Sequence, residues 1–273
     1  MKVSLNKLQE QELINLYLKG SSTKELCIKY GWSLNNRHGP LDILKKNNIF
    51  IRKDNETHNI KYTINNVYFE KINSIDKAYF LGLIYADGSI HYKKAEMKLP
   101  LQEKDKIILD KFNYYINSNK PLRINKAKIK NRSNMYSFVI ENRKIIEDLK
   151  KLGVLPNKES NIKFPYFLKE KYISHFIRGF FDGDGSIYKQ GSSLVFNFTG
   201  THNMINSINE LLSKKFSIEL RKIYKRHKDR DHNMGYQISW YGKKISKLFY
   251  DWIYKDCNDL YINRKKEKFE ELL

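Results

Sequence analysis

The sequence has few of the features that several protein classes require. Two cysteines, Cys27 and Cys257, occur in 273 residues, which is too few for a disulfide framework, and neither has a partner at the spacing of a zinc site. The longest apolar run, Ala78 to Ala86, is far shorter than the roughly 20 residues that cross a bilayer, and no charged-then-apolar leader opens the chain. We therefore expect a soluble, intracellular protein of a reducing compartment (cytoplasm, nucleoid or organelle matrix), without a membrane partner.

Acidic residues are also in short supply. The chain has 30 Asp and Glu against 51 Lys and Arg, a formal net charge of +21, and a soluble protein that far from neutrality repels itself unless it meets an anionic partner. Its 19 tyrosines and 15 phenylalanines are interleaved with the basic residues, which suits base stacking as well as phosphate contact. The composition favours a nucleic acid partner, although an AT-rich genome, which enriches Asn, Lys, Ile and Tyr, would account for part of the charge.

The N-terminal part of the chain has the pattern of three short helices. The first stops at Gly20, a suitable C-terminal cap. Ser22 then begins a second helix, and Glu25 three residues later completes a capping box. Gly39 and Pro40 fall where a third helix should be continuous, so that helix must start late, at Pro40, or be broken.

This arrangement is similar to a helix-turn-helix module, in which the helix after the turn lies in the major groove. We therefore predict a DNA-binding module of this kind at residues 1–55, with a small helical cap that has no DNA role as the alternative. Residues 51–75 are polar, rich in Asn and Lys, and without sustained periodicity, which predicts a linker at 56–75.

An internal repeat dominates the rest of the chain. The segment FLGLIYADGSI at 80–90 matches IRGFFDGDGSI at 177–187 position for position, at an offset of 97 (187 minus 90). Each copy is followed by alternating apolar stretches typical of strands (135–140, 193–198) and amphipathic stretches typical of helices (107–116, 204–216). The repeat predicts an α+β fold of two similar units, at 76–165 and 166–273.

Small residues recur four apart in both copies of the motif, Gly82 with Ala86 and Gly179 with Gly183. On a helix this spacing leaves a narrow stripe without side-chain bulk. We therefore predict that the two motif helices pack backbone to backbone, which would bring their ends together.

Each motif helix ends in an Asp-Gly pair. The acids are Asp87 and Asp184, and we expect Gly88 and Gly185 to take the left-handed conformation common after a helix. The helix dipole makes a carboxylate there unfavourable by roughly 0.3 to 1 kcal/mol, so two such acids brought close call for a cation. Oxygen ligands favour Mg²⁺ or a similar hard ion, completed by water and substrate phosphate. Such an ion can activate water for phosphodiester hydrolysis.

Asp182 is a rival ligand in the second copy. Its counterpart in the first copy is Tyr85, so Asp182 does not belong to the repeated pair of acids. A calcium-binding loop that starts at Asp182 is also excluded, because Ile187 stands where an EF-hand needs glycine.

The two motifs resemble the paired signature of the LAGLIDADG homing endonucleases, and the resemblance covers about residues 60–273. It implies two αββαββα units related by a pseudo-two-fold axis, whose sheets form a saddle over the DNA major groove. It also implies that the last acid of each copy, Asp87 or Asp184, binds metal, with the carbonyls of Ala86 and Gly183 as further ligands. Motifs that only pack helices, with inert acids, are the alternative.

A basic residue follows the last strand-like stretch of each unit, Arg143 in the first and Lys243 in the second. This position resembles that of the family's active-site lysine, which implies a catalytic role beside the scissile phosphate or the attacking water. A solvated helix start is the alternative interpretation of both residues.

We therefore predict a monomeric, site-specific double-strand DNA endonuclease that depends on Mg²⁺, accepts Mn²⁺ as a substitute and binds Ca²⁺ without turnover. Two non-identical repeats predict a long, nearly asymmetric target. The alternatives are a catalytically silent DNA-binding regulator, against which the presence of both acids argues, and an RNA splicing maturase of the same fold. Met1 and Leu273 lack the chemistry of intein termini, so we expect a free-standing or intron-encoded protein.

Overall fold

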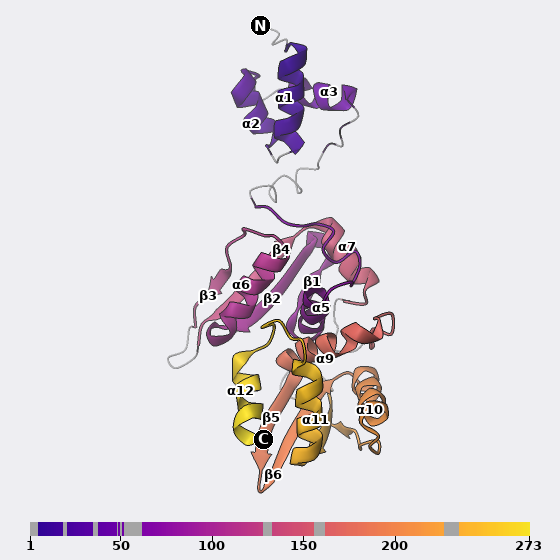
Figure 1. Ribbon diagram of the computed structural model, residues 1–273. Helices are drawn as coiled ribbons and strands as arrows, with labels where there is room; N and C mark the ends of the chain where they lie inside the picture. Colours follow the sequence, from indigo (N-terminus) through magenta and orange to yellow (C-terminus); the bar gives the residue numbers. More distant parts are fainter. Residues whose placement is uncertain are drawn as a thin grey trace. The chain divides into compact units, whose positions relative to one another are not determined.

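The computed structural model describes residues 5–18, 21–34, 38–47, 49, 51, 62–127, 133–155, 162–226 and 235–273. The chain forms two compact units, Met1–Thr63 and Ile64–Leu273, which are coloured along the sequence in Figure 1. Gly20 and part of the segment predicted as a linker lie outside the described residues, so both expectations stay predictions.

The described part of the first unit is helical and contains α1 (Lys7–Leu18), α2 (Thr23–Tyr30) and α3 (His38–Lys46). The predicted capping box is confirmed: the Glu25 N–H donates to Ser22 Oγ at 3.1 Å, and the Ser22 N–H donates to Glu25 Oε2 at 2.8 Å. Leu13, Leu26 and Leu44 come one from each helix and are buried together. These three residues are part of a hydrophobic core that belongs to the small unit itself.

The third helix starts late, as Gly39 and Pro40 require, but at His38 rather than at Pro40. Both residues fall in its first turn, where proline is tolerated because the N–H groups there have no partner within the helix. Gly39 also lies against the Trp32 ring, since a Cβ there would stand 2.4 Å from Trp32 Cε2. The glycine therefore permits close packing and does not break the helix.

The second unit contains two copies of the same succession of elements, helix, two strands, helix, two strands, helix (Figure 1). The first copy is α5 (Ile75–Asp87), β1 (Ser89–His91), β2 (Glu96–Gln102), α6 (Lys106–Tyr115), β3 (Arg123–Asn125), β4 (Met135–Glu141) and α7 (Arg143–Lys151). The second copy is α9 (Glu170–Asp184), β5 (Gly185–Gln190), β6 (Ser193–Gly200), α10 (His202–Phe216), β7 (Tyr224–Lys225), β8 (Tyr236–Tyr241) and α11 (Lys243–Tyr254). The predicted α+β class with two αββαββα repeats is confirmed.

One further helix, α12 (Asn263–Leu272), follows the second copy and has no place in the αββαββα order. The repeat in the sequence does not predict this helix. Its inner side is formed by Lys265 and Phe269, which are four residues apart and both buried. Among the described helices, none combines the length and the apolar composition needed to cross a bilayer.

Each repeat contains one four-stranded antiparallel sheet, with the strand order β1-β2-β4-β3 in the first and β5-β6-β8-β7 in the second. Alternate side chains of a strand point to opposite faces. Met97, Leu99 and Leu101 of β2 are buried on one face, against which α6 and α7 pack, while α10 and α11 pack against the second sheet. The other face of each sheet, turned away from these helices, is called the far face below.

The motif helices α5 and α9 pack against each other through their glycines, as predicted. A Cβ on Gly82 would lie 2.1 Å from the Phe176 carbonyl oxygen, and a Cβ on Gly179 would lie 2.0 Å from the Tyr79 carbonyl oxygen. The same offset of 97 relates the two glycines (179 minus 82) and the two carbonyls (176 minus 79). The contact is therefore reciprocal, and it joins the two repeats backbone to backbone.

We predict that Gly179→Ala destabilises the second unit by about 3 kcal/mol, because the methyl group would meet helix backbone that cannot move aside. Helix propensity alone would favour alanine by about 1 kcal/mol, so the sign of the change separates the two effects. The measurement is the urea dependence of unfolding. Gly235→Ala is the control, since its Cβ would meet only Arg226 Cδ at 3.9 Å. Equal stability changes in the two variants would contradict the close crossing.

Candidate active site

The two repeated acids stand at corresponding places, because Asp87 is the last residue of α5 and Asp184 is the last residue of α9. Both are half-buried. A Cβ added to Gly183 would lie 2.2 Å from Ala86 Cβ and 2.9 Å from Asp87 Oδ2. The first carboxylate thus lies against the residue that precedes the second acid, and the helix crossing brings together two acids that are distant in sequence.

The glycines after these acids are extended, and the expected left-handed conformation is wrong. Gly88 has φ −69° and Gly185 has φ −95°. Each helix runs directly into a strand, so the chain continues straight where a left-handed residue would turn it. Glycine is needed here for space, since a Cβ on Gly88 would lie 2.7 Å from the Ile84 carbonyl oxygen and one on Gly185 would lie 2.1 Å from Phe181 Cδ2.

The donor set at the helix ends fits a hard divalent ion. Asp87 and Asp184 supply carboxylate oxygens. The Gly183 carbonyl accepts from Lys265 Nζ at 3.3 Å, so its role as a metal ligand, like that of the Ala86 carbonyl, stays a prediction. Within the described residues, no group of three or more His, Cys, Asp or Glu side chains is placed to hold a metal. An ion held by two carboxylates would complete its shell with water and substrate phosphate, which is the usual condition of Mg²⁺ in phosphoryl-transfer sites.

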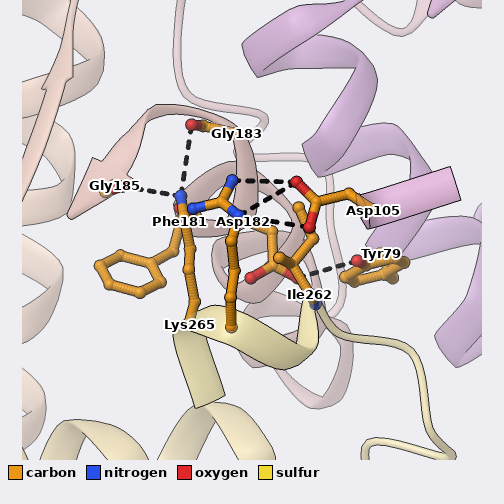
Figure 2. A network of polar contacts seen from close by, with 9 residues as sticks. Tyr79, Asp105, Phe181, Asp182, Gly183, Gly185, Ile262 and Lys265 are labelled. Carbon is orange, nitrogen blue, oxygen red and sulfur yellow. Dashed lines mark hydrogen bonds and ion pairs between the residues drawn. The ribbon is translucent and has the colours of Figure 1, made fainter. Parts of the chain in front are cut away.

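Lys265 of α12 reaches the same helix end and was missed by the sequence analysis. Its Nζ donates to the carbonyl oxygens of Phe181 at 2.6 Å, Gly185 at 2.7 Å and Gly183 at 3.3 Å (Figure 2). Burial lowers the pKa of the ammonium to about 8, against the attraction of three carboxylates: Asp182, Asp87 and Asp184. The only sequence signal for an inward lysine is its spacing of four residues from Phe269.

Asp182 holds chain segments together in the interior. Its Oδ2 accepts from the Tyr79 hydroxyl at 2.8 Å and from the Ile262 N–H at 2.9 Å (Figure 2). Its counterpart Tyr85 donates its hydroxyl to the Leu152 carbonyl. Both residues therefore anchor the chain that follows the last helix of their own αββαββα unit. The first unit does so with a hydroxyl that donates, and the second with a carboxylate that accepts.

A buried arginine was also missed. Arg178 of α9 is fully buried, and its guanidinium donates to the carbonyls of Leu260 and Ile253, each at 2.6 Å. It also lies over the Tyr79 ring, with 5.2 Å between Cζ and the ring centroid. Burial lowers its pKa, which the nearby tyrosine and Asp182 oppose. Arg178 thus fastens the segment before α12 to the motif helix.

Comparison with known proteins agrees with this geometry. Residues 171–254 match the LAGLIDADG-like domain family. Among solved structures, the homing endonuclease I-WcaI bound to its DNA recognition sequence is similar, with a TM-score of 0.50 and 16% identity, over 82% of this chain and 97% of that chain. This chain has the LAGLIDADG fold. The resemblance inferred from the two motifs is thereby confirmed.

Two further similarities were found. The N-terminal LAGLIDADG domain of WhiA has a TM-score of 0.44 and 14% identity, over 82% of this chain and 98% of that one. An uncharacterized protein of Methanocaldococcus jannaschii is 28% identical over 155 residues, which is 53% of either protein. The chain therefore spans about half the length of the curated relative it matches.

Arg143 and Lys243, the predicted basic residues of the LAGLIDADG repeats, are the exposed first residues of α7 and α11. In the first sheet, Ser89 pairs with Lys98, which pairs with Val139, and Arg143 is four residues beyond Val139. Arg143 thus lies two residues beyond the end of β4, at the start of α7. Lys243 Nζ donates to the Leu273 carbonyl at 3.2 Å. Their catalytic roles stay predictions.

The strand register places two other polar residues beside the LAGLIDADG motifs. Lys98 pairs with Ser89, and Asn197 pairs with Ser186, and each serine stands two residues after its motif acid. Lys98 is half-buried and Asn197 is buried. Neither residue is indicated by the sequence alone, because only the pairing of the strands brings them near the ends of the motif helices.

We predict that Tyr79→Phe destabilises the protein more at pH 8 than at pH 5. Burial raises the pKa of Asp182 to about 6. Because the folded state holds this proton more tightly than the unfolded state, the protein becomes less stable as the pH rises toward that value. The Tyr79 hydroxyl opposes this loss, so its removal should cost about 1 to 3 kcal/mol once Asp182 is ionised, and less when it is protonated. Urea unfolding at both pH values measures the difference.

Tyr92→Phe is the matched control, because its hydroxyl donates to the Val154 carbonyl at 2.9 Å and not to an acid. Its effect should be the same at both pH values. If Tyr79→Phe also cost the same at pH 5 and pH 8, the hydroxyl would not be supporting a charged Asp182.

Proposed function

We propose that this chain is a site-specific, divalent-metal-dependent DNA endonuclease that cuts both strands of its target. The observation that carries the proposal is the meeting of Asp87 and Asp184 at the crossed ends of the motif helices, partly open to solvent. The net charge of +21 supports a polyanionic substrate. I-WcaI, whose fold is similar, is bound to its DNA recognition sequence. Because one chain supplies both acids, we expect a monomer.

The chain's own contribution to cleavage would be to hold the reacting groups in place. Asp87 and Asp184 would bind the ion, and the carbonyls of Ala86 and Gly183 would complete its protein ligands. Bound Mg²⁺, or Mn²⁺ as a substitute, supplies an acidified water and stabilises the charge on the leaving oxygen. Ca²⁺ is larger and accepts irregular coordination, so we expect it to support binding without cutting.

The two sheets carry different side chains on their far faces. In the first sheet the far face includes charged residues: Glu96, Lys98, Arg123 and Glu141. In the second sheet the paired strand residues of this face are uncharged: Ser186, Tyr188, Gln190, Ser193, Val195, Asn197, Thr199, Tyr224, Gln237, Ser239 and Tyr241. Arginine and lysine suit guanine, whereas Asn and Gln suit adenine. If these faces read DNA, the two half-sites differ, which supports a long, nearly asymmetric target.

We predict that Asp87→Asn and Asp184→Asn each abolish double-strand cleavage and leave duplex affinity within about tenfold, because the acids serve the metal and not the DNA. Cleavage of a selected target is measured with Mg²⁺, and affinity is measured with Ca²⁺. Asp251→Asn is the control, since this exposed acid pairs with Lys247 on α11. Full cleavage by either motif variant would contradict the assignment. Binding by the unaltered chain with no cleavage under any divalent ion would favour a DNA-binding regulator.

We predict that Arg143→Met and Lys243→Met lower the single-turnover cleavage rate by roughly tenfold to a thousandfold with little change in affinity, as expected if each stabilises charge in the transition state. Lys98→Met belongs in the same assay, because Lys98 pairs with Ser89, which stands two residues after Asp87. A phosphate anchor would behave differently, weakening affinity and reducing the salt slope by about one. Slowing by Lys98→Met alone would move the catalytic role from Arg143 to Lys98.

We further propose that the N-terminal helical unit binds DNA next to the cleavage target. Removal of residues 1–55 should weaken binding and shorten the footprint but spare metal-dependent cleavage at high protein concentration, because a tethered module acts through effective concentration. Footprinting and titration of the truncated protein measure both effects. Unchanged affinity and footprint would leave the unit as a helical cap without a DNA role.

A further inference from the structure

The helix that lies outside the two αββαββα units contributes a buried charge to the end of the second motif helix. Lys265 stands in the first turn of α12 and is only 5% exposed. The dipole of α12 itself disfavours a cation in that turn, so the position of Lys265 is not explained by its own helix. The groups that Lys265 contacts belong to the end of α9, which packs against α12 (Figure 2).

Those partners are backbone carbonyl oxygens at the end of α9: Phe181 and Gly183 lie in its last turn, and Gly185 is the residue that follows it. The Lys265 ammonium has three donors, and it donates to the carbonyls of Phe181, Gly183 and Gly185. All its donors are therefore used within three residues of Asp184. Asp87 and Asp184 both attract the ammonium, and Gly183, whose carbonyl accepts from it, packs against the Asp87 carboxylate.

The segment that carries Lys265 is held from both repeats. The Ile262 N–H donates to Asp182 of α9, and Arg264 Nε and Nη2 contact the Asp105 carboxylate of the first repeat at 3.0 to 3.2 Å. Asp105 is itself buried. With the residues on both sides fixed, the ammonium has a fixed position relative to the crossing of α5 and α9.

We propose that Lys265 is a positioning residue of the cleavage centre, a fixed cation behind the Asp87 and Asp184 pair that holds the two carboxylates together before a divalent ion or DNA arrives. The term cleavage centre rests on the endonuclease function proposed above. The contacts of Lys265 with backbone are to α9, so its loss should disturb Asp184 more than Asp87.

The first test needs neither metal nor DNA. Thermal unfolding in EDTA is measured for the full chain with and without Asp184→Asn, in the unaltered and in the Lys265→Met background. Without the ammonium, one attraction that offsets the repulsion between the two carboxylates is lost, so removing one of them should help. We expect Asp184→Asn to raise the Tm by at least about 3 °C more in the Lys265→Met background than in the unaltered chain. Equal shifts in both backgrounds would overturn the proposal.

Two further variants support this double-mutant cycle, one as a control and one as a substitute for Lys265→Met. Lys268→Met removes the same charge from an exposed position of α12 that pairs with Glu271, and its shift with Asp184→Asn should match that of the unaltered chain. Lys265→Gln retains donors for the carbonyls but has no charge. If Lys265→Met does not fold, Lys265→Gln carries the same cycle with the same expected sign. A lysine that only capped backbone would give no coupling in either variant.

The second test follows the two DNA strands separately. Lys265→Met should change the ratio of the two strand-cutting rates by about tenfold or more at saturating Mg²⁺, whereas partial unfolding would lower both rates equally. Equal slowing of both strands would count against the positioning role. If the unaltered chain cuts no DNA, the endonuclease proposal fails, and the unfolding cycle still decides whether Lys265 holds the acid pair.

Discussion

The reciprocal glycine contact between α5 and α9 is the constraint on which the rest of the second unit depends. Gly82 and Gly179 let the backbone of each helix touch the other, at distances no side chain would allow. Because the acids end these same helices, the crossing sets their separation as well. Each helix then runs straight into the first strand of its own sheet, so the crossing also sets where the two far faces begin. Packing, acid pair and sheet placement are thus consequences of one contact.

That contact creates an electrostatic problem, which buried charges resolve. Two helix ends and two carboxylates collect negative potential in one place. The Lys265 ammonium, which contacts the end of α9, neutralises part of this negative potential. Asp182 and Arg178 hold the segment before α12 against α9. Buried ions are costly unless their hydrogen bonds are satisfied, and here backbone carbonyls accept from both cations. The C-terminal helix is therefore part of the candidate active site, although it belongs to neither repeat.

The repeats share a backbone plan and differ in chemistry. Tyr85 and Asp182 anchor equivalent returning segments with a hydroxyl and a carboxylate. Lys98 and Asn197 stand at equivalent register positions, each paired with the serine two residues after a motif acid, and one is charged while the other is neutral. The far faces follow the same division, since charged residues occur in the first sheet and uncharged ones among the paired strand residues of the second. One pseudo-symmetric scaffold thereby carries two unlike surfaces, as an asymmetric duplex would require.

The repeated motif by itself determined the α+β class, the two units, the stripe of small residues and the acid pair, because these depend on periodicity and on residue types that recur at a constant spacing. Tertiary structure decided the rest. Gly88 and Gly185 are extended because a strand follows at once, which no local preference for glycine reveals. Lys265 reads as one basic residue of a polar helix, yet it is buried because α12 packs on α9. Such placements depend on contacts between segments some 80 residues apart, and local sequence carries no record of them.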